Sequence, residues 1–255
     1  MTKIEMRDIK RDFIIKENRQ LSSRTWLLRL SGDVSDFTAS GQFVNIAIPS
    51  KYLRRPISVN RFFPIEKELH LLYNIAGDGT EILSEMKVGS SLNLLVGLGN
   101  GFSIPAEIEH PVLLGGGIGA APLSQLAYDL IENGKKPVVV IGYNNVNESW
   151  GMEKELRNSG ISSFVATIDG SEGTKGFVTD VLKEHRIKFD YFYACGPMPM
   201  LKALSSLSTE GELSLECRMG CGYGACMCCS LETKDGNKRI CKEGPVFKKS
   251  ELLWK

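Results

Sequence analysis

Cysteine spacing near one end of the sequence constrains this chain more than any other feature. Five of its seven cysteines lie in the stretch CRMGCGYGACMCCS (217–230). Within that stretch Cys221, Cys226 and Cys229 follow the pattern C-x4-C-x2-C, and Cys241 comes after eleven further residues. A C-x4-C-x2-C run with a later cysteine is typical of plant-type [2Fe–2S] sites. The spacing therefore predicts that these four cysteines hold a [2Fe–2S] cluster.

The residues around these cysteines suit a loop folded tightly against a cluster. Gly222 and Gly224 can adopt the left-handed backbone and the close approach that such a loop requires. Structural zinc is the alternative, but zinc sites usually pair two short C-x2–4-C knuckles, and Cys241 stands alone with no histidine nearby. Cys217 and Cys228 fall outside the spacing. We expect them to be small, partly buried residues, with ligand exchange by Cys228 as the alternative.

Bulk composition excludes several other classes of protein. The 255 residues include 31 basic and 30 acidic side chains, a net charge of +1, which gives no electrostatic reason to expect a nucleic acid or a membrane surface as partner. No run of about 20 apolar residues predicts a membrane span, and the opening MTKIEMRDIKRDF lacks the apolar core of an export signal. We therefore expect a cytoplasmic protein, in which clustered cysteines more often bind metal or do redox chemistry than form disulfides.

Hydrophobic patterning divides the chain into two kinds of fold. The first hundred residues contain short runs ended by Gly, Asn or Asp, such as GQFVNIAIP (41–49), in which Val44, Ile46 and Ile48 share one face. Such runs predict a small antiparallel barrel or sandwich. After residue 101, strand patterns alternate with helical ones, which predicts a doubly wound parallel sheet. The predicted elements are strand 111–117, helix 122–134, strands 136–144 and 162–170, helix 176–185, strand 189–197 and helix 198–207.

Two stretches in the first half carry residues suited to a flavin. In LRRPISVN (53–60), Arg55 can pair with a phosphate and the Ser58 hydroxyl can meet a flavin edge. In LLYNIAGDGT (71–80), Tyr73 can stack on a ring, and the small residues that follow let the backbone approach a pyrophosphate. Each stretch is a weak signal, since RRP in a loop is usually a solvated turn. Their succession favours a flavin site, with solvated turns as the alternative that the residues alone leave open. The residues expected near the pyrophosphate are Gly77, Gly79 and Thr80.

A glycine-rich turn, LLGGGIGAAPL (113–123), follows a predicted strand and opens a predicted helix. Gly115, Gly117 and Ala120 satisfy G-x-G-x-x-G/A, in which glycines permit the turn and the helix N-terminus offers free N–H groups to a phosphate. The acidic residue expected at the end of the next strand is missing from VVVIGYNN, and no arginine follows at once to hold a 2′-phosphate. The turn therefore predicts a dinucleotide site, with NAD favoured over NADP.

A second strand-to-helix junction, YACGPMPML (193–201), contains a cysteine outside the cluster. Cys195 is either a small buried residue that ends a strand, or a residue at the carboxyl edge of the sheet near a bound nicotinamide. The three histidines lie outside every motif, and no Ser/His/Asp or Cys/His set is apparent. We therefore expect no catalytic residue here and a reaction performed by cofactors.

The order of these signals resembles the ferredoxin–NADP reductase superfamily and, within it, the electron-transfer subunits of NAD-dependent class B dihydroorotate dehydrogenases. Matching stretches along nearly the whole chain include LRRPIS, GDGT, GGGIGAAPL, CGPMPMLKAL, CRMGCGYGAC and GPVF. Two residues depart from the family, which often has glutamate at the position of Cys217 and a small residue at that of Cys228. The resemblance implies an FAD-binding β-barrel (1–102), an NAD-binding α/β domain (103–211) and a small [2Fe–2S] domain (212–255).

The resemblance also implies which residues bind each group. FAD would be contacted by Arg55, Pro56, Ile57, Ser58, Leu72, Tyr73, Asn74, Gly79 and Thr80. The glycine turn and the CGP junction would hold NAD through Gly115, Gly116, Gly117, Gly119, Cys195, Gly196 and Pro197. The cluster ligands would be Cys221, Cys226, Cys229 and Cys241.

The activity implied by the resemblance is electron transfer. Nicotinamides exchange two electrons as hydride and a cluster passes one, while a flavin can do both. Electrons would run from dihydroorotate to the FMN of a separate catalytic chain, then through the cluster and FAD to NAD⁺, giving orotate in pyrimidine synthesis. Two chains of each kind would form a heterotetramer. Two alternatives stay open: the small FAD and cluster subunit of a ferredoxin-dependent transhydrogenase or sulfide dehydrogenase, and a non-enzymatic zinc-binding interaction module.

Overall fold

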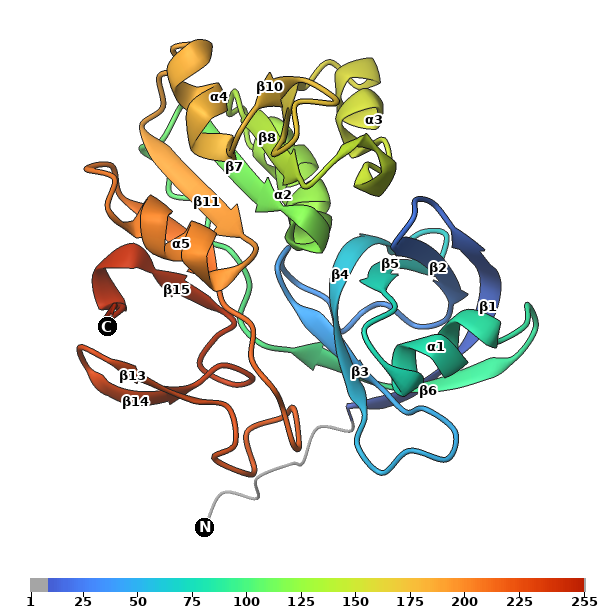
Figure 1. Cartoon of the computed structure of the whole chain (residues 1–255). Helices are drawn as coiled ribbons and strands as arrows, with labels where there is room; N and C mark the ends of the chain where they lie inside the picture. The colour runs from blue at the N-terminus through green and yellow to red at the C-terminus, as the bar shows by residue number, and fades with distance from the viewer. Residues whose placement is uncertain (1–8, 255) are drawn as a thin grey trace.

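A closed antiparallel barrel forms the first part of the chain. The structure is a computed structural model that describes residues 9–254. Within that range the barrel strands follow the order β1-β2-β5-β4-β3-β6 (Figure 1), which confirms the predicted barrel. The strands are β1 (Lys10–Gln20), β2 (Thr25–Ser31), β3 (Phe43–Ile46), β4 (Arg55–Phe63), β5 (Glu68–Asn74) and β6 (Ser91–Leu98), and helix α1 (Asp78–Glu85) lies between β5 and β6.

Strand β3 is buried on both faces, unlike an ordinary barrel strand. Val44 and Ile46 point into the barrel core, as the alternation predicts. Phe43, on the opposite face, packs into a second core that includes Cys229 and Cys241. The cysteine-bearing segment therefore covers the outer face of β3.

A seven-stranded sheet forms the middle of the molecule, in the order β10-β9-β8-β7-β11-β12-β15. All neighbouring strands are parallel except β12 and β15, which are antiparallel. Strands β8 and β11 flank β7 on opposite sides, which creates the switch point where open α/β sheets bind ligands. The strands are β7 (Pro111–Gly116), β8 (Val138–Tyr143), β9 (Ser162–Thr167), β10 (Thr174–Lys175), β11 (Tyr191–Cys195), β12 (Gly211–Ser214) and β15 (Val246–Lys248).

Helices cover both faces of this sheet, so the predicted doubly wound fold is confirmed. Helices α2 (Ala121–Glu132) and α3 (Met152–Asn158) pack on one face, and α4 (Val178–Glu184) and α5 (Met198–Ser205) on the other. None of the helices in residues 9–254 is both long and apolar enough to span a membrane. Three 3-10 turns complete the set: η1 (Gly117–Ala120), η2 (Val146–Glu148) and η3 (Lys249–Glu251).

The cysteine-bearing segment is an excursion between two strands of the central sheet. It leaves the sheet after β12, forms the hairpin of β13 (Ser230–Thr233) and β14 (Gly236–Arg239), and returns at β15. The predicted division between residues 211 and 212 therefore falls inside β12. Sequence patterning missed β12 and β15 because strands of three or four residues carry too little periodicity to be recognised.

Candidate redox site

Four of the residues predicted near the flavin, Arg55, Gly77, Gly79 and Thr80, line a pocket at the N-terminus of α1. This pocket, of about 370 Å³, is lined by Arg55 and residues 76–80. A Cβ on Gly79 would overlap the Nε and Cζ atoms of Arg55, so glycine is needed for the guanidinium to lie against the turn. Asp78, at the same helix end, pairs with Lys51 over 3.0 Å. The helix N-terminus and the Arg55 cation both favour an anion, and the pocket therefore suits the pyrophosphate of a flavin nucleotide.

The other predicted flavin residues lie on two neighbouring strands of the barrel, β4 and β5. They are Pro56, Ile57, Ser58, Leu72, Tyr73 and Asn74. Tyr73 is 2% exposed, its hydroxyl donates to Asn18 Oδ1 at 2.9 Å, and its ring lies beside Trp26. The barrel core encloses the tyrosine ring. The expectation that this ring stacks on a flavin is therefore corrected.

The four predicted cluster ligands lie as two neighbouring pairs. The Sγ atoms of Cys229 and Cys241 are 3.2 Å apart, and both residues are 2% exposed. The backbone N–H of Cys226 donates to Cys221 Sγ at 3.4 Å. Among residues 9–254, no three or more His, Cys, Asp or Glu side chains are already placed to hold a metal ion. Two pairs of cysteines match in number the needs of a centre with two irons, each of which takes two cysteines.

Backbone N–H groups are directed at one of these sulfurs. Burial raises the pKa of Cys221, but N–H groups of Cys226, Tyr223 and Ala225 favour its thiolate and bring that pKa down to about 6. Burial and the adjacent Cys229 raise the pKa of Cys241 to about 12. Iron ligation requires the thiolate form. Cys221 is readily ionised, whereas Cys229 and Cys241 are shielded from solvent.

The two cysteines outside the spacing contact Arg218, and Cys217 also lies beside the predicted ligand Cys229. The thiols of Cys217 and Cys228 lie 3.4 Å and 3.7 Å from the carbonyl oxygen of Arg218, to which both donate. Cys217 is partly buried against the core that holds Cys229, as expected, whereas Cys228 is exposed, so the expectation of burial was wrong for that residue. The structure thus gives the two extra thiols a local structural contact.

The cysteine loop is held from two sides. Gly222 and Gly224 have φ of +77° and +88°, as the tight loop requires. Arg239 Nη1 donates to the carbonyl of Gly224 from the β14 side. From the barrel side, Asn45 Nδ2 on β3 donates to the carbonyl of Cys221 at 3.2 Å. Asn45 had no sequence signal beyond its place in an alternating strand, and the sequence reasoning missed it.

The glycine turn and the CGP junction are packed against each other at the end of β7 and β11. A Cβ on Gly119 would lie 2.6 Å from the carbonyl oxygen of Cys195, and one on Gly116 would lie 2.7 Å from Pro197 Cδ. Gly117 differs, because its φ is +52° and a Cβ there would meet nothing within 4 Å. Gly116 and Gly119 thus allow backbone contact inside the protein, while Gly117 faces open space where a ligand can approach. Two more of the residues predicted to hold NAD pack in the same region. Gly115 packs on Ala120, and Gly196 packs on Gly116.

Cys195 ends β11 beside Ser214 of β12, with which it pairs in register. Burial raises the pKa of its thiol to about 12, so the neutral form prevails. The residue therefore lies at the carboxyl edge of the sheet, next to the switch point, as an uncharged thiol.

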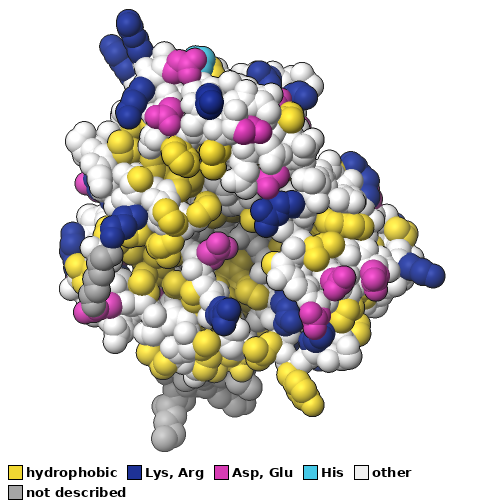
Figure 2. Space-filling model, viewed as in Figure 1, with side chains coloured by type: hydrophobic (Ala, Val, Ile, Leu, Met, Phe, Trp, Pro, Cys, Tyr) yellow, Lys and Arg dark blue, Asp and Glu magenta, His cyan; other side chains and the backbone are white. Residues whose placement is uncertain are grey.

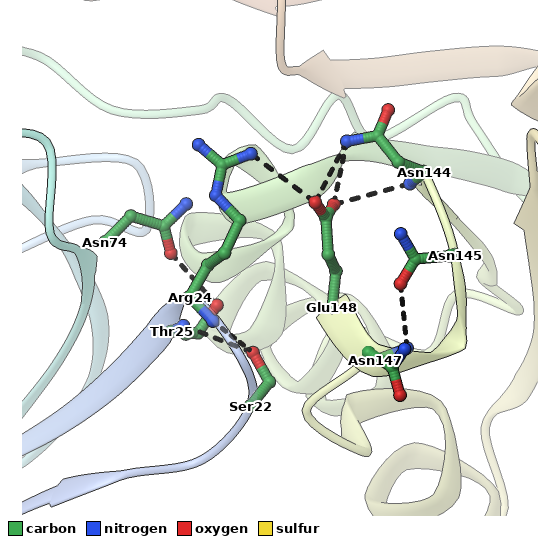
Figure 3. Close-up of polar contacts among 8 residues, drawn as sticks. All are labelled: Ser22, Arg24, Thr25, Asn74, Asn144, Asn145, Asn147 and Glu148. Atoms are coloured by element: carbon green, nitrogen blue, oxygen red, sulfur yellow. Dashed lines mark hydrogen bonds and ion pairs between the residues drawn. The ribbon is translucent and has the colours of Figure 1, made fainter.

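A polar network joins the barrel to the end of β8 (Figure 3). Glu148 Oε2 accepts from Asn144 Nδ2 at 2.9 Å, and Glu148 Oε1 pairs with Arg24 Nη1 at 3.4 Å. Thr25, next to Arg24, donates to Asn74 Oδ1 at 3.0 Å. The carboxylate that was missing from the end of β8 in sequence is thus supplied by η2. Sequence reasoning missed Glu148 because it looked only at the strand end itself.

One face of the molecule is hollowed where its three parts meet. Figure 2 shows that the surface is hollowed between the barrel, the central sheet and the C-terminal segment, and that hydrophobic side chains gather there. Figure 1 shows the same three parts meeting at this place. A face of this kind can hold a large planar ligand between a nucleotide site and a metal site.

Comparison with known proteins identifies relatives of the whole chain. A family model described as the iron–sulfur cluster binding domain of dihydroorotate dehydrogenase B matches residues 216–253. Two relatives share the name dihydroorotate dehydrogenase B (NAD(+)), electron transfer subunit. The protein of Fusobacterium nucleatum is 39% identical over 254 residues, which cover 94% of this chain and 97% of the relative. That of Geobacillus sp. is 41% identical over 250 residues, which cover 94% and 96%.

Solved structures show the same fold. A structure of an NADH-dependent reduced ferredoxin-NADP oxidoreductase, described in connection with flavin-based electron bifurcation, has a TM-score of 0.86 and 28% identity, and the match covers 95% of this chain and 90% of that one. A ferredoxin NADP⁺ reductase from Neisseria gonorrhoeae, with bound FAD and NADP, has a TM-score of 0.64 and 17% identity over 76% and 88% of the two chains. This second likeness concerns the fold alone.

Proposed function

The chain belongs to the family of electron transfer subunits of dihydroorotate dehydrogenase B (NAD(+)), and we propose that it carries electrons from a catalytic partner chain to NAD⁺. The overall reaction would oxidise dihydroorotate to orotate in pyrimidine synthesis. The partner would contain FMN, and two chains of each kind would assemble in the cytoplasm. Within this chain, residues 1–102 would bind FAD, 103–211 NAD and 212–255 the cluster.

The structure offers a fitting environment for each group. The pocket at Arg55 and Gly79 supports the assignment of the FAD pyrophosphate, because a cation and a helix N-terminus meet there. The open space above Gly117 supports an NAD phosphate contact. When bound, a flavin between these sites can exchange hydride with NAD and single electrons with a cluster. The other residues proposed to contact FAD and NAD are those named from the resemblance, with Tyr73 contributing through its backbone.

Side chains and backbone groups of this chain would interact with the phosphates, the cluster and NAD at defined atoms. Arg55 would neutralise phosphate oxygens, and backbone N–H groups would stabilise the thiolate of Cys221. Cys195 would remain a neutral thiol beside the nicotinamide, since burial raises its pKa. Glu148 would hold a ribose hydroxyl at the end of β8, because a carboxylate there accepts from the 2′-OH of NAD and repels a 2′-phosphate. None of these side chains is proposed to react with dihydroorotate.

One observation carries the proposal more than the others. The loop that contains Cys221 lies directly on β3, where Asn45 donates a hydrogen bond to the Cys221 carbonyl. Asn45 in turn pairs in register with Pro56 of β4, the strand predicted to contact the flavin. A cluster held by this loop would thus be one strand away from residues proposed to bind FAD. Single-electron exchange needs such closeness, whereas a zinc-binding interaction module would have no use for it.

The experiment that tests the proposal is an anaerobic visible spectrum of the purified chain with assays for iron, zinc and flavin. We expect FAD and about two irons per chain, the content of one [2Fe–2S] cluster. A colourless preparation that contains zinc would contradict the proposal.

The choice of partner needs a separate measurement, since the bifurcating oxidoreductase structure shares 28% identity over 95% of this chain. Co-purification from the native cell should bring down an FMN-containing chain that oxidises dihydroorotate. A partner with a second FAD and no activity on dihydroorotate would instead favour the transhydrogenase alternative.

A further inference from the structure

Asn45 lies in the middle of β3, on the outer face of the barrel. Its neighbours Val44 and Ile46 point into the barrel core, so alternation along the strand directs the Asn45 amide outward. The residue is nevertheless 1% exposed, because the cysteine loop covers it. A polar side chain on such a strand would ordinarily be solvated, and its burial here calls for a specific partner.

The amide is committed to the cysteine loop. Its Nδ2 donates to the carbonyl of Cys221 at 3.2 Å, while its Oδ1 is buried and has no hydrogen-bond partner in the described part of the chain. The next loop residue, Gly222, has φ of +77°, and a Cβ on it would overlap Asn45 Nδ2. Residue 222 must therefore be glycine both for its backbone conformation and to let the amide approach.

The barrel holds Asn45 firmly from the other side. Its backbone pairs with Pro56 of β4, and its carbonyl accepts from Arg54 Nη1 at 3.1 Å. Arg54 also donates to the carbonyl and the side chain of Asn93 on β6, at 3.0 Å and 2.7 Å. Asn45 thus links the backbone of Cys221 to the strand that begins with Arg55.

We propose that Asn45 is a positioning residue that fixes the separation between the cluster and the flavin. The inference rests on the proposed function, since it concerns the step between those two groups. Asn45 donates its hydrogen bond to a backbone carbonyl of the loop, so we expect the cluster to assemble without it. A loop released from β3 would sample larger separations, and transfer would slow because its rate falls steeply with distance.

The test is the variant Asn45→Ala in the full chain, reduced anaerobically with NADH in a stopped-flow instrument. Flavin bleaching and cluster reduction are followed at separate wavelengths. We expect unchanged iron and FAD content, an unchanged rate of flavin reduction, and a cluster reduction that is slower by about tenfold. This is less than the loss of about a hundredfold that a misplacement of about 1 Å can cause between reacting groups. An unchanged cluster rate would overturn the proposal, and so would loss of iron, which would give the amide a role in holding the cluster.

Asn60→Ala is the matched control. Asn60 is another buried amide of the barrel, and its Nδ2 donates at 2.8 Å to the carbonyl of Ala121 on the nucleotide side. Its loss removes a hydrogen bond of the same type, and the flavin-to-cluster step should keep its rate. Equal slowing in both variants would show general loosening and overturn the specific role of Asn45.

A second set of variants tests the contact without relying on one substitution. Gly222→Ala and Gly224→Ala both strain a left-handed backbone, but the added Cβ meets Asn45 only at 222, and meets the flexible side chain of Lys242 at 224. The EPR spectrum of the reduced cluster should change more in Gly222→Ala than in Gly224→Ala. Adding Asn45→Ala should partly restore the spectrum of Gly222→Ala but not that of Gly224→Ala. Strictly additive effects would contradict the proposal.

Failure of this inference differs from failure of the proposed function. A wild-type chain that lacks iron or flavin would remove the proposed function itself. A wild-type chain that transfers electrons, with Asn45→Ala at the same rate, would remove only the role of Asn45.

Discussion

The guanidinium of Arg55 lies where a side chain on Gly79 would be, so the two residues can line the flavin pocket together only because residue 79 is glycine. The arginine begins β4 and the glycine lies in the first turn of α1. Neither stretch was more than a weak signal by itself. Together they form a pocket with two sources of positive potential, the Arg55 guanidinium and the N-terminus of α1.

Replacing Gly79 by alanine should weaken FAD binding. The new Cβ would push Arg55 off the turn and remove its contact with the pyrophosphate. We expect the FAD dissociation constant to rise by about tenfold, which corresponds to about 1.4 kcal/mol. Titration of the flavin-free chain, followed by the quenching of FAD fluorescence, measures it.

Arg55→Ala, alone and together with Gly79→Ala, provides the control for that substitution. If the Cβ on residue 79 acts by displacing the guanidinium, Arg55→Ala should weaken FAD binding to a similar extent. Adding Gly79→Ala to Arg55→Ala should then cost little more, because the two changes remove the same contact. Fully additive losses would show that displacement of Arg55 is not the cause.

Serine at Cys226 should remove the cluster, while serine at Cys228 should not. Cys226 belongs to the C-x4-C-x2-C spacing and donates its N–H to Cys221 Sγ, whereas Cys228 is exposed and contacts the Arg218 carbonyl. Iron per chain and the visible spectrum distinguish the two variants. FAD content should be unchanged in both, since the flavin pocket lies on the barrel. Iron retained in Cys226→Ser would contradict the ligand assignment.

Glu148→Gln should relax the choice between NADH and NADPH. The carboxylate lies at the end of β8 beside Asn144, and its removal eliminates repulsion of a 2′-phosphate and frees Arg24 to contact it. We expect the ratio of kcat/KM for NADH over NADPH to fall by about tenfold. Steady-state kinetics with a dye acceptor provides the ratio.

Glu155→Gln is the control for the cofactor choice. Glu155 also pairs across the two domains, with Arg61 at 3.2 Å, but it lies on α3 away from the end of β8. The NADH preference should survive this change. A parallel fall in both variants would assign the effect to domain contact and not to the ribose.

Glu212→Gln should stabilise the chain at neutral pH. Glu212 is buried on β12, and burial raises its pKa although Ser103 N–H donates to it at 2.9 Å. A carboxyl with a raised pKa contributes stability below its unfolded value of about 4.5 and loses it as pH rises through the folded pKa. The melting temperature of the variant should exceed that of wild type at pH 8, by a few degrees, and the difference should shrink toward pH 4.

Glu210→Gln serves as the control for that pH dependence. Glu210 is two residues earlier, is exposed, and pairs with Lys249 at 3.5 Å. Its substitution should leave the melting temperature nearly unchanged at both pH values. Stabilisation by Glu212→Gln that is equal at pH 4 and pH 8 would contradict the titration argument.

Much of this protein could be predicted from local sequence. The barrel, the doubly wound sheet and the glycine turn follow from periodicity and from turn residues, because these reflect backbone geometry over a few residues. Pro122 and Gly134 delimit α2 as expected. The cysteine spacing likewise indicates the kind of metal centre, since the ligands are close along the chain.

Other features were decided only by the tertiary structure. The sequence could not show that Tyr73 is enclosed by the barrel core, or that β12 and β15 anchor the cysteine segment to the sheet. It also could not pair Arg24 with Glu148, or Asn45 with Cys221, residues that are 124 and 176 positions apart.

Cysteine spacing, strand alternation and glycine turns were therefore set by the sequence itself, because each depends on neighbours along the backbone. The distance between the cluster loop and the flavin strand was set by the packed structure, because it depends on how β3 is buried between two cores. Such contacts arise when the whole chain closes around shared apolar surface, and no local pattern encodes which distant residues will then meet.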